Sequence, residues 1–151
     1  MAKFNFRLQG LLTMKYKMED QKKQEYGLYM AEVEREKHKK QKLLDHKEEK
    51  TIEFRHRIDE VINPPGLLNY NNYIEFLKEE AKQQDKIILE AQKKAEKKRQ
   101  ELVESMKERK TLEKLSERQY EVFLIEQKLA EQRVADEMMS YRFDNRDAEE
   151  T

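Results

Sequence analysis

The chain has 151 residues, of which 42% are charged and 36% hydrophobic, and its 32 basic residues balance its 32 acidic ones. The absence of cysteine excludes disulfides and thiolate chemistry. Balanced charge argues against nucleic acid as a ligand, because a phosphate-binding face needs a sustained excess of Lys and Arg. No apolar run approaches the length of a signal-peptide core or a transmembrane span, so we expect no direct membrane insertion.

The first predicted helix runs from about residue 5 to about residue 62, with Asn5 as its cap. Alternating steps of four and three residues from Leu8 pass through Leu12 and Val33. Several other positions on the same stripe are charged, so the heptad pattern is present but weak.

One cluster of helix breakers, Asn63-Pro64-Pro65-Gly66, interrupts the chain. Two consecutive prolines remove two backbone donors and push the preceding residue out of the helical region. Gly66 tolerates the positive φ that a sharp reversal can require. The sequence therefore predicts a turn at residues 63–69.

The second predicted helix runs from about residue 70 to about residue 143, and Asn72 with Glu75 makes a plausible capping pair. Its apolar stripe is stronger than that of the first helix and includes Leu77 and Ile88. We expect residues 144–151 to form a flexible tail.

These elements predict an all-α fold, a long antiparallel coiled-coil hairpin of two helices that forms a single domain over residues 1–151. Folding the chain about Gly66 places residue i opposite roughly residue 132 − i, which sets Phe54 near Leu77 and Tyr29 near Val103. The same register sets the basic run 37–42 against the basic run 93–99 and predicts a positive belt.

Residues 130–143 have no facing segment in this hairpin. They carry five large apolar side chains: Val134, Met138, Met139, Tyr141 and Phe143. An overhanging helix with an apolar side is typical of a segment that binds a partner; the alternative is a frayed end.

Motifs for catalysis are missing from the sequence, so we expect no enzymatic activity and no cofactor. Glu53 and His56 have the Glu-x-x-His spacing of di-iron bundles, but such sites need a second motif on a facing helix. All three histidines lie in the first arm, so we expect no metal site. A solvated histidine beside an ion-pair partner is the preferred interpretation.

Two short motifs resemble the FliJ family of flagellar export proteins. The first is Phe4-x-Phe6-Arg7-Leu8-Gln9-x-Leu11-Leu12, and the second is Asn69-Tyr70-Asn71-Asn72-Tyr73-Ile74-x-x-Leu77. The resemblance spans essentially the whole chain. It implies a stalk-like antiparallel coiled coil of the flagellar type III export apparatus.

The resemblance also implies partners: the hexameric export ATPase (FliI-like), the export gate protein (FlhA-like) and export chaperones. It implies a cytoplasmic protein that associates peripherally with the membrane at the flagellar base. Family members bind the gate through residues that open the second helix, where Tyr73 and Leu77 match. For the ATPase ring we expect the end with both termini, namely Leu8, Leu11, Leu12, Val134, Met138, Met139 and Tyr141.

A generic coiled-coil tether, a self-associating rod or a helical chaperone is the alternative. Chaperones of the prefoldin kind carry a β-hairpin between their arms, and residues 64–71 are too short for one.

Overall fold

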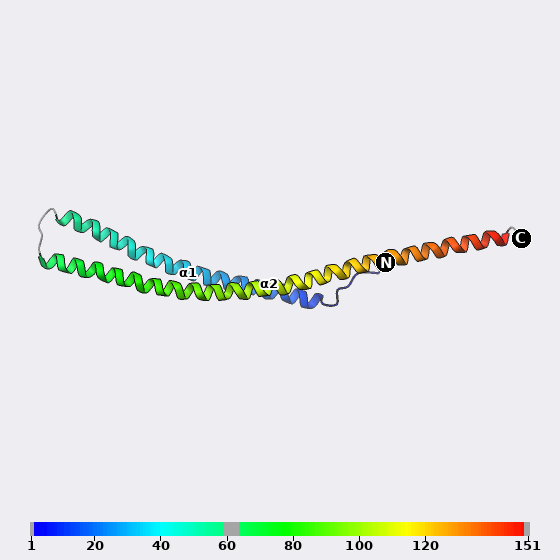
Figure 1. The fold of residues 1–151 in the computed structure, drawn as a ribbon, viewed down its shortest axis with the longest axis horizontal. Coiled ribbons are helices and arrows are strands. Elements are labelled where there is room, and N and C mark those ends of the chain that lie inside the picture. The colour runs from blue at the N-terminus through cyan, green and yellow to red at the C-terminus, as the bar shows by residue number, and fades with distance from the viewer. Residues whose placement is uncertain (1, 59–63, 150–151) are drawn as a thin grey trace. The chain divides into compact units, whose positions relative to one another are not determined.

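The computed structural model folds into two antiparallel helices, α1 (Gln9–Ile58) and α2 (Pro64–Glu149), joined at one end (Figure 1). The structure describes residues 2–58 and 64–149, except for the side chains of residues 145 and 147–149. No strand occurs in these ranges. The predicted all-α antiparallel hairpin is confirmed.

Helix α1 begins at Gln9, four residues later than the predicted cap at Asn5. The amide of Gln9 donates a hydrogen bond to the carbonyl of Phe6 at 3.0 Å. The Phe6 side chain is buried, and the Phe4 ring packs against two aromatic rings of α2. Because this packing favours a non-helical segment, it outweighs the capping preference of Asn5.

Helix α2 begins at Pro64, so residues 64–69 are helical and not part of the predicted turn. Proline is tolerated in the first turn of a helix, where its missing N–H would have no intrahelical partner. Residues 59–63, which include the predicted end of the first helix, lie outside the described residues. Helix α2 also continues to Glu149, because no glycine or proline follows Phe143 to end it.

The chain divides into two compact units, which are considered separately. The first consists of Glu19–Glu104 and is called the hairpin unit; the second consists of Met1–Met18 with Ser105–Thr151 and is called the terminal unit. The buried apolar side chains of the hairpin unit are mostly small: Val33, Leu77, Ala81, Ile88, Ala91 and Ala95. A single domain over the whole chain remains a prediction.

The register of the hairpin unit differs from the one predicted. Phe54 stacks on Tyr70, with ring centroids 3.8 Å apart, and does not face Leu77. Likewise the Tyr29 ring lies 5.5 Å from the ammonium of Lys98, not opposite Val103. Facing residues therefore lie about two helical turns earlier on α2 than expected. The reason is that α2 is already helical from Pro64, so the chain does not reverse at Gly66.

The predicted positive belt is wrong for the same reason. Lys40 pairs with Asp85 at 2.6 Å, and Lys98 pairs with Glu25 at 3.2 Å. Lys22 reaches Glu101 at 3.2 Å. These three lysines thus meet carboxylates across the helices, and the two basic runs do not face each other.

One pair of polar side chains lies buried within the seam of the hairpin unit. The Gln84 amide donates hydrogen bonds to the backbone carbonyl of Glu36 at 3.0 Å and to the Glu36 carboxylate. Both residues are buried. Because a buried amide or carboxylate without a partner costs free energy, this contact favours the register in which the two side chains meet.

Paired spin labels would test the register. Labels at Gln41 and Gln83, both exposed and at the same level in the structure, are expected to give the shorter distance. The distance between labels at Glu48 and Gln83 is expected to be longer, because Glu48 lies one heptad, about 10 Å, further along the same face of α1. A shorter Glu48–Gln83 distance would contradict the register.

The carboxylates of the seam predict acid sensitivity. Hydrogen bonds from Lys39 and then Gln84 lower the pKa of Glu36, and those from Lys22 and then Lys98 lower the pKa of Glu101. The folded state therefore binds these protons more weakly than the unfolded state does. The stabilisation is present above the ordinary glutamate pKa, about 4.3, and is lost as the pH falls through the lower folded values.

Thermal unfolding followed by circular dichroism is expected to show a falling midpoint from about pH 5 downward. Glu101→Gln should flatten this dependence, whereas Glu104→Gln at an exposed position should not. Equal slopes for Glu101→Gln and the unchanged chain would contradict the assignment.

Candidate partner-binding surfaces

An aromatic cluster lies near the start of α2 in the hairpin unit. It comprises His46 and Phe54 of α1 with Tyr70, Tyr73 and Phe76 of α2, and is called the turn-proximal cluster. Helical spacing places Tyr73 one turn after Tyr70 and Phe76 one turn after Tyr73, so the three rings share one side of α2. The sequence thus gathers five rings within a few turns of the reversal.

Tyr73 is held across the helices by His46. The His46 Nε2 atom and the Tyr73 hydroxyl are 2.6 Å apart, and the two rings meet edge to face at 5.8 Å. The other ring nitrogen of His46 lies 3.9 Å from the Glu49 carboxylate. These contacts fix the orientation of a tyrosine that remains partly exposed.

The two residues expected to bind the gate occupy different positions. Leu77 is 4% exposed and belongs to the seam, whereas Tyr73 is half-buried. Phe76, which the sequence analysis did not select, is 56% exposed. The sequence could have identified Phe76 as a surface residue, because it follows Tyr73 by three residues and lies outside the apolar stripe.

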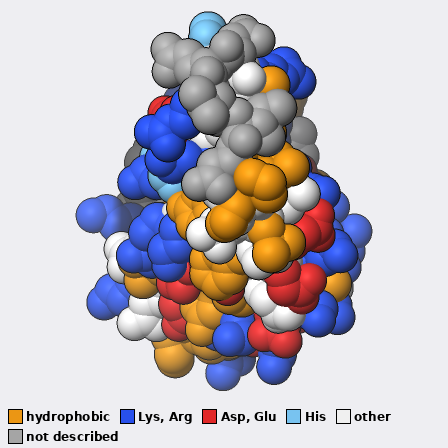
Figure 2. Space-filling model, turned by 90° about the vertical axis from the view of Figure 1, so that its left-hand side faces the viewer, with side chains coloured by type: hydrophobic (Ala, Val, Ile, Leu, Met, Phe, Trp, Pro, Cys, Tyr) orange, Lys and Arg blue, Asp and Glu red, His pale blue; other side chains and the backbone are white. Residues whose placement is uncertain are grey.

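More apolar side chains are exposed at the same end of the hairpin unit: Ile52, Ile58, Leu67 and Leu68. Figure 2 looks onto this end and shows hydrophobic side chains in a band, bordered by basic groups on one side and acidic groups on the other. An apolar band with a charged border is typical of a protein-binding surface.

In the terminal unit, the segment before α1 packs on α2. The Phe4 ring lies 5.2 Å from that of Tyr120 and 5.6 Å from that of Phe123. The Gln127 amide donates a hydrogen bond to the Ala2 carbonyl at 3.2 Å. This aromatic clamp was not found from the sequence, because it depends on a non-helical segment.

The three leucines expected to contact the ATPase ring lie in this unit. Leu12 is buried at 6% exposure, so its place is in the packing. Leu8 and Leu11 are each exposed by more than a third. They can therefore contribute to a binding surface, whereas Leu12 packs in the interior of the unit.

Residues 130–144 of α2 form the C-terminal segment, every residue of which is exposed. Its large apolar side chains are Val134, Met138, Met139, Tyr141 and Phe143, with exposures from 52% to 70%. A shallow groove runs along one side, lined by Ala130, Glu131, Val134, Ala135 and Met138. In Figure 1 no other described element of the terminal unit runs beside this part of α2.

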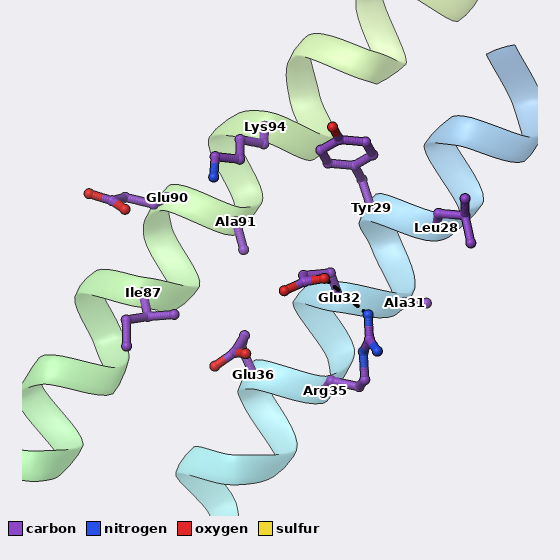
Figure 3. Close-up of a pocket in the computed structure, with 10 residues that line it drawn as sticks. All are labelled: Leu28, Tyr29, Ala31, Glu32, Arg35, Glu36, Ile87, Glu90, Ala91 and Lys94. Carbon is purple, nitrogen blue, oxygen red and sulfur yellow. Dashed lines mark hydrogen bonds and ion pairs between the residues drawn. The ribbon is translucent and has the colours of Figure 1, made fainter.

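A groove also crosses the middle of the hairpin unit (Figure 3). Glu32 and Glu36 project from α1 toward α2, and Ala91 projects from α2 toward α1. Arg35 donates to Glu32 at 3.0 Å, so part of the charge is already paired. The groove is open and lacks the enclosed arrangement of polar groups that a substrate site needs.

Glu53 and His56 show no sign of metal ligation. Glu53 pairs with Lys50 at 2.9 Å and with Arg57 at 2.8 Å, and these contacts lower its pKa. Over residues 2–58 and 64–149, no group of three or more potential metal ligands comes together. Within the same ranges, no helix has the length and hydrophobicity to cross a membrane.

The comparison with protein families gives one match. The sequence profile described as flagellar FliJ protein matches residues 4–148, nearly the whole chain. Neither the curated proteins nor the solved structures gave a match. Two antiparallel helices and a match of this length agree with the resemblance in the two sequence motifs. The chain therefore belongs to the FliJ family and is a component of the flagellar export apparatus.

Proposed function

We propose that this protein is a non-enzymatic adaptor that binds the export ATPase ring and the export gate through separate surfaces, and that also engages export chaperones. The observation that carries the proposal is the presence of two exposed apolar surfaces in different units, the turn-proximal cluster and the C-terminal segment. Family membership supplies the apparatus in which such an adaptor acts. Its place is the cytoplasmic side of the membrane at the flagellar base.

The turn-proximal cluster is the proposed gate-binding surface. Aromatic residues contribute strongly to protein interfaces because they bury a large area with few rotatable bonds. Tyr73 is already oriented by His46, so little conformational entropy is lost when a partner covers it. Phe76 adds an exposed ring beside it, and Leu77 supports both from within the seam.

Replacing Tyr73 with alanine should weaken binding to the gate protein about tenfold, since a well-placed aromatic anchor contributes 1 kcal/mol or more. Helical content should not change, because Tyr73 is only partly buried. Isothermal titration calorimetry and circular dichroism measure the two quantities.

The matched control for Tyr73→Ala is Tyr141→Ala, another tyrosine of α2 but in the C-terminal segment and 70% exposed. It should leave gate binding intact and weaken binding to the ATPase. Unchanged gate binding in the Tyr73→Ala variant, or equal losses in both variants, would rule out the assignment.

The C-terminal segment is the proposed ATPase-ring contact. Five large apolar side chains on one helix expose area to water, and burying it contributes ~25 cal/mol per Å² before the costs of association. Leu8 and Leu11 extend the apolar surface of the terminal unit. Leu12 and the aromatic clamp hold that unit together.

Truncation after Leu129 tests this contact. It should abolish most of the stimulation of ATP hydrolysis, and most of the ring assembly, while changing the thermal midpoint little. Among the removed residues, 130–144 and 146 are described and exposed, so they bury little area within the chain. ATPase assays and thermal melts of the same preparations give both numbers.

Val134→Ser with Met138→Ser is the milder control for the truncation, because it keeps the helix and removes apolar surface. It should reproduce the loss of stimulation in part. If the truncated chain melts much earlier, the segment is structural; if stimulation is unaffected, the ring is bound elsewhere.

A further inference from the structure

The seam of the hairpin unit has strict heptad spacing on both helices. On α2 the buried positions are Leu77, Ala81, Gln84, Ile88, Ala91 and Ala95, at alternating steps of four and three residues. The α1 positions from Lys22 to Phe54 follow the same alternation and are buried or half-buried. Because the spacing repeats every seven residues, sliding one helix by a heptad keeps the same faces together.

Apolar packing alone distinguishes poorly between these two registers. In the observed register Val33 packs with Ala91 and Ala95, and Phe54 stacks on Tyr70. One heptad further along, Leu43 would meet Ile88, Phe54 would meet Leu77 and Tyr29 would meet Leu102. The second set is also apolar, although Val33 would then face Lys98 in place of the two alanines. Small alanines in the seam present no large knob that would block the movement.

Polar contacts do distinguish the registers. Gln84 reaches Glu36 only in the observed one, and three cross-helix ion pairs, of Lys22, Lys40 and Lys98, accompany it. After a slide of one heptad, Ala91 would take the place of Gln84 beside Glu36, and Glu36 would lose its amide donor. In coiled coils generally, a single buried polar residue can fix the register in this way, because other registers leave it without a partner.

We propose that Glu36 and Gln84 form a register lock, which holds the hairpin unit in one of two heptad registers. When the lock is released, the helices slide by one heptad and the chain reverses nearer Gly66. The first turn of α2 can unwind readily, since it consists of Pro64, Pro65 and Gly66.

The slide has a consequence for the surface near the reversal. The stacking of Phe54 on Tyr70 and the hydrogen bond between His46 and Tyr73 exist only in the observed register. A ligand that binds the assembled turn-proximal cluster would therefore favour the locked register. The lock itself does not depend on which partner binds there.

Distance measurements between spin labels test the lock in the full chain. The chain has no cysteine, so cysteines placed at Gln41 and Gln83 carry the only labels. Gln84→Leu removes the amide and adds apolar area to the seam, while Lys39 still pairs with the Glu36 carboxylate at 2.9 Å, so the hairpin stays folded. We expect a second population in this variant at a longer distance, because the two labelled sites move apart by about 10 Å along the helix axis, the rise of one heptad.

The pair Glu48 and Gln83 should show the opposite change, a second population at shorter distance, because Glu48 would come level with Gln83. Gln92→Leu, at an exposed position of the same helix, is the matched control and should keep one population. A single unchanged distance in Gln84→Leu would overturn the proposal, as would two populations in Gln92→Leu.

Discussion

The contact between Gln84 and Glu36 decides how the two helices of the hairpin unit face each other. The amide donates to both the backbone and the carboxylate of Glu36, and both residues are buried. The ion pair of Lys40 with Asp85 and the stacking of Phe54 on Tyr70 follow from the same alignment. In a seam with many small apolar side chains, the polar contacts determine the register.

A seam of this kind limits how much free energy the two helices can gain from each other. Val33 is the most completely buried side chain of the seam, and three of the buried positions of α2 are alanines. Many large apolar groups lie outside the seam, in the turn-proximal cluster, the aromatic clamp and the C-terminal segment. Two helices with a thin core and exposed rings at the margins suit a protein that acts by binding other proteins.

The two helices and their antiparallel arrangement could be predicted from the sequence. The scarcity of helix breakers outside residues 63–66 predicted both helices, and the single cluster of breakers predicted their antiparallel arrangement. The register was not predictable from apolar matching, since two alignments about one heptad apart satisfy it nearly equally. Gln84 and Glu36 distinguish them, but a polar residue at a seam position reads from sequence as a defect in the pattern.

The ends of the helices and the exposure of the site residues also depend on tertiary contacts that the sequence pattern does not reveal. Pro64 and Pro65 fit both the end of a turn and the first turn of a helix, and tertiary structure selects the second. The late start of α1 depends on Phe4 meeting Tyr120 and Phe123, a contact over more than a hundred residues. Leu77 matched a family position, yet burial places it beneath the surface that Tyr73 and Phe76 expose.

The proposed adaptor holds two partners at once, through surfaces in separate units. Native mass spectrometry of the full-length protein with the export ATPase and the cytoplasmic part of the export gate tests it most directly. The account predicts a complex that contains all three proteins, with the gate retained when the ATPase is added. Displacement of one partner by the other, with no ternary species at any ratio, would contradict it.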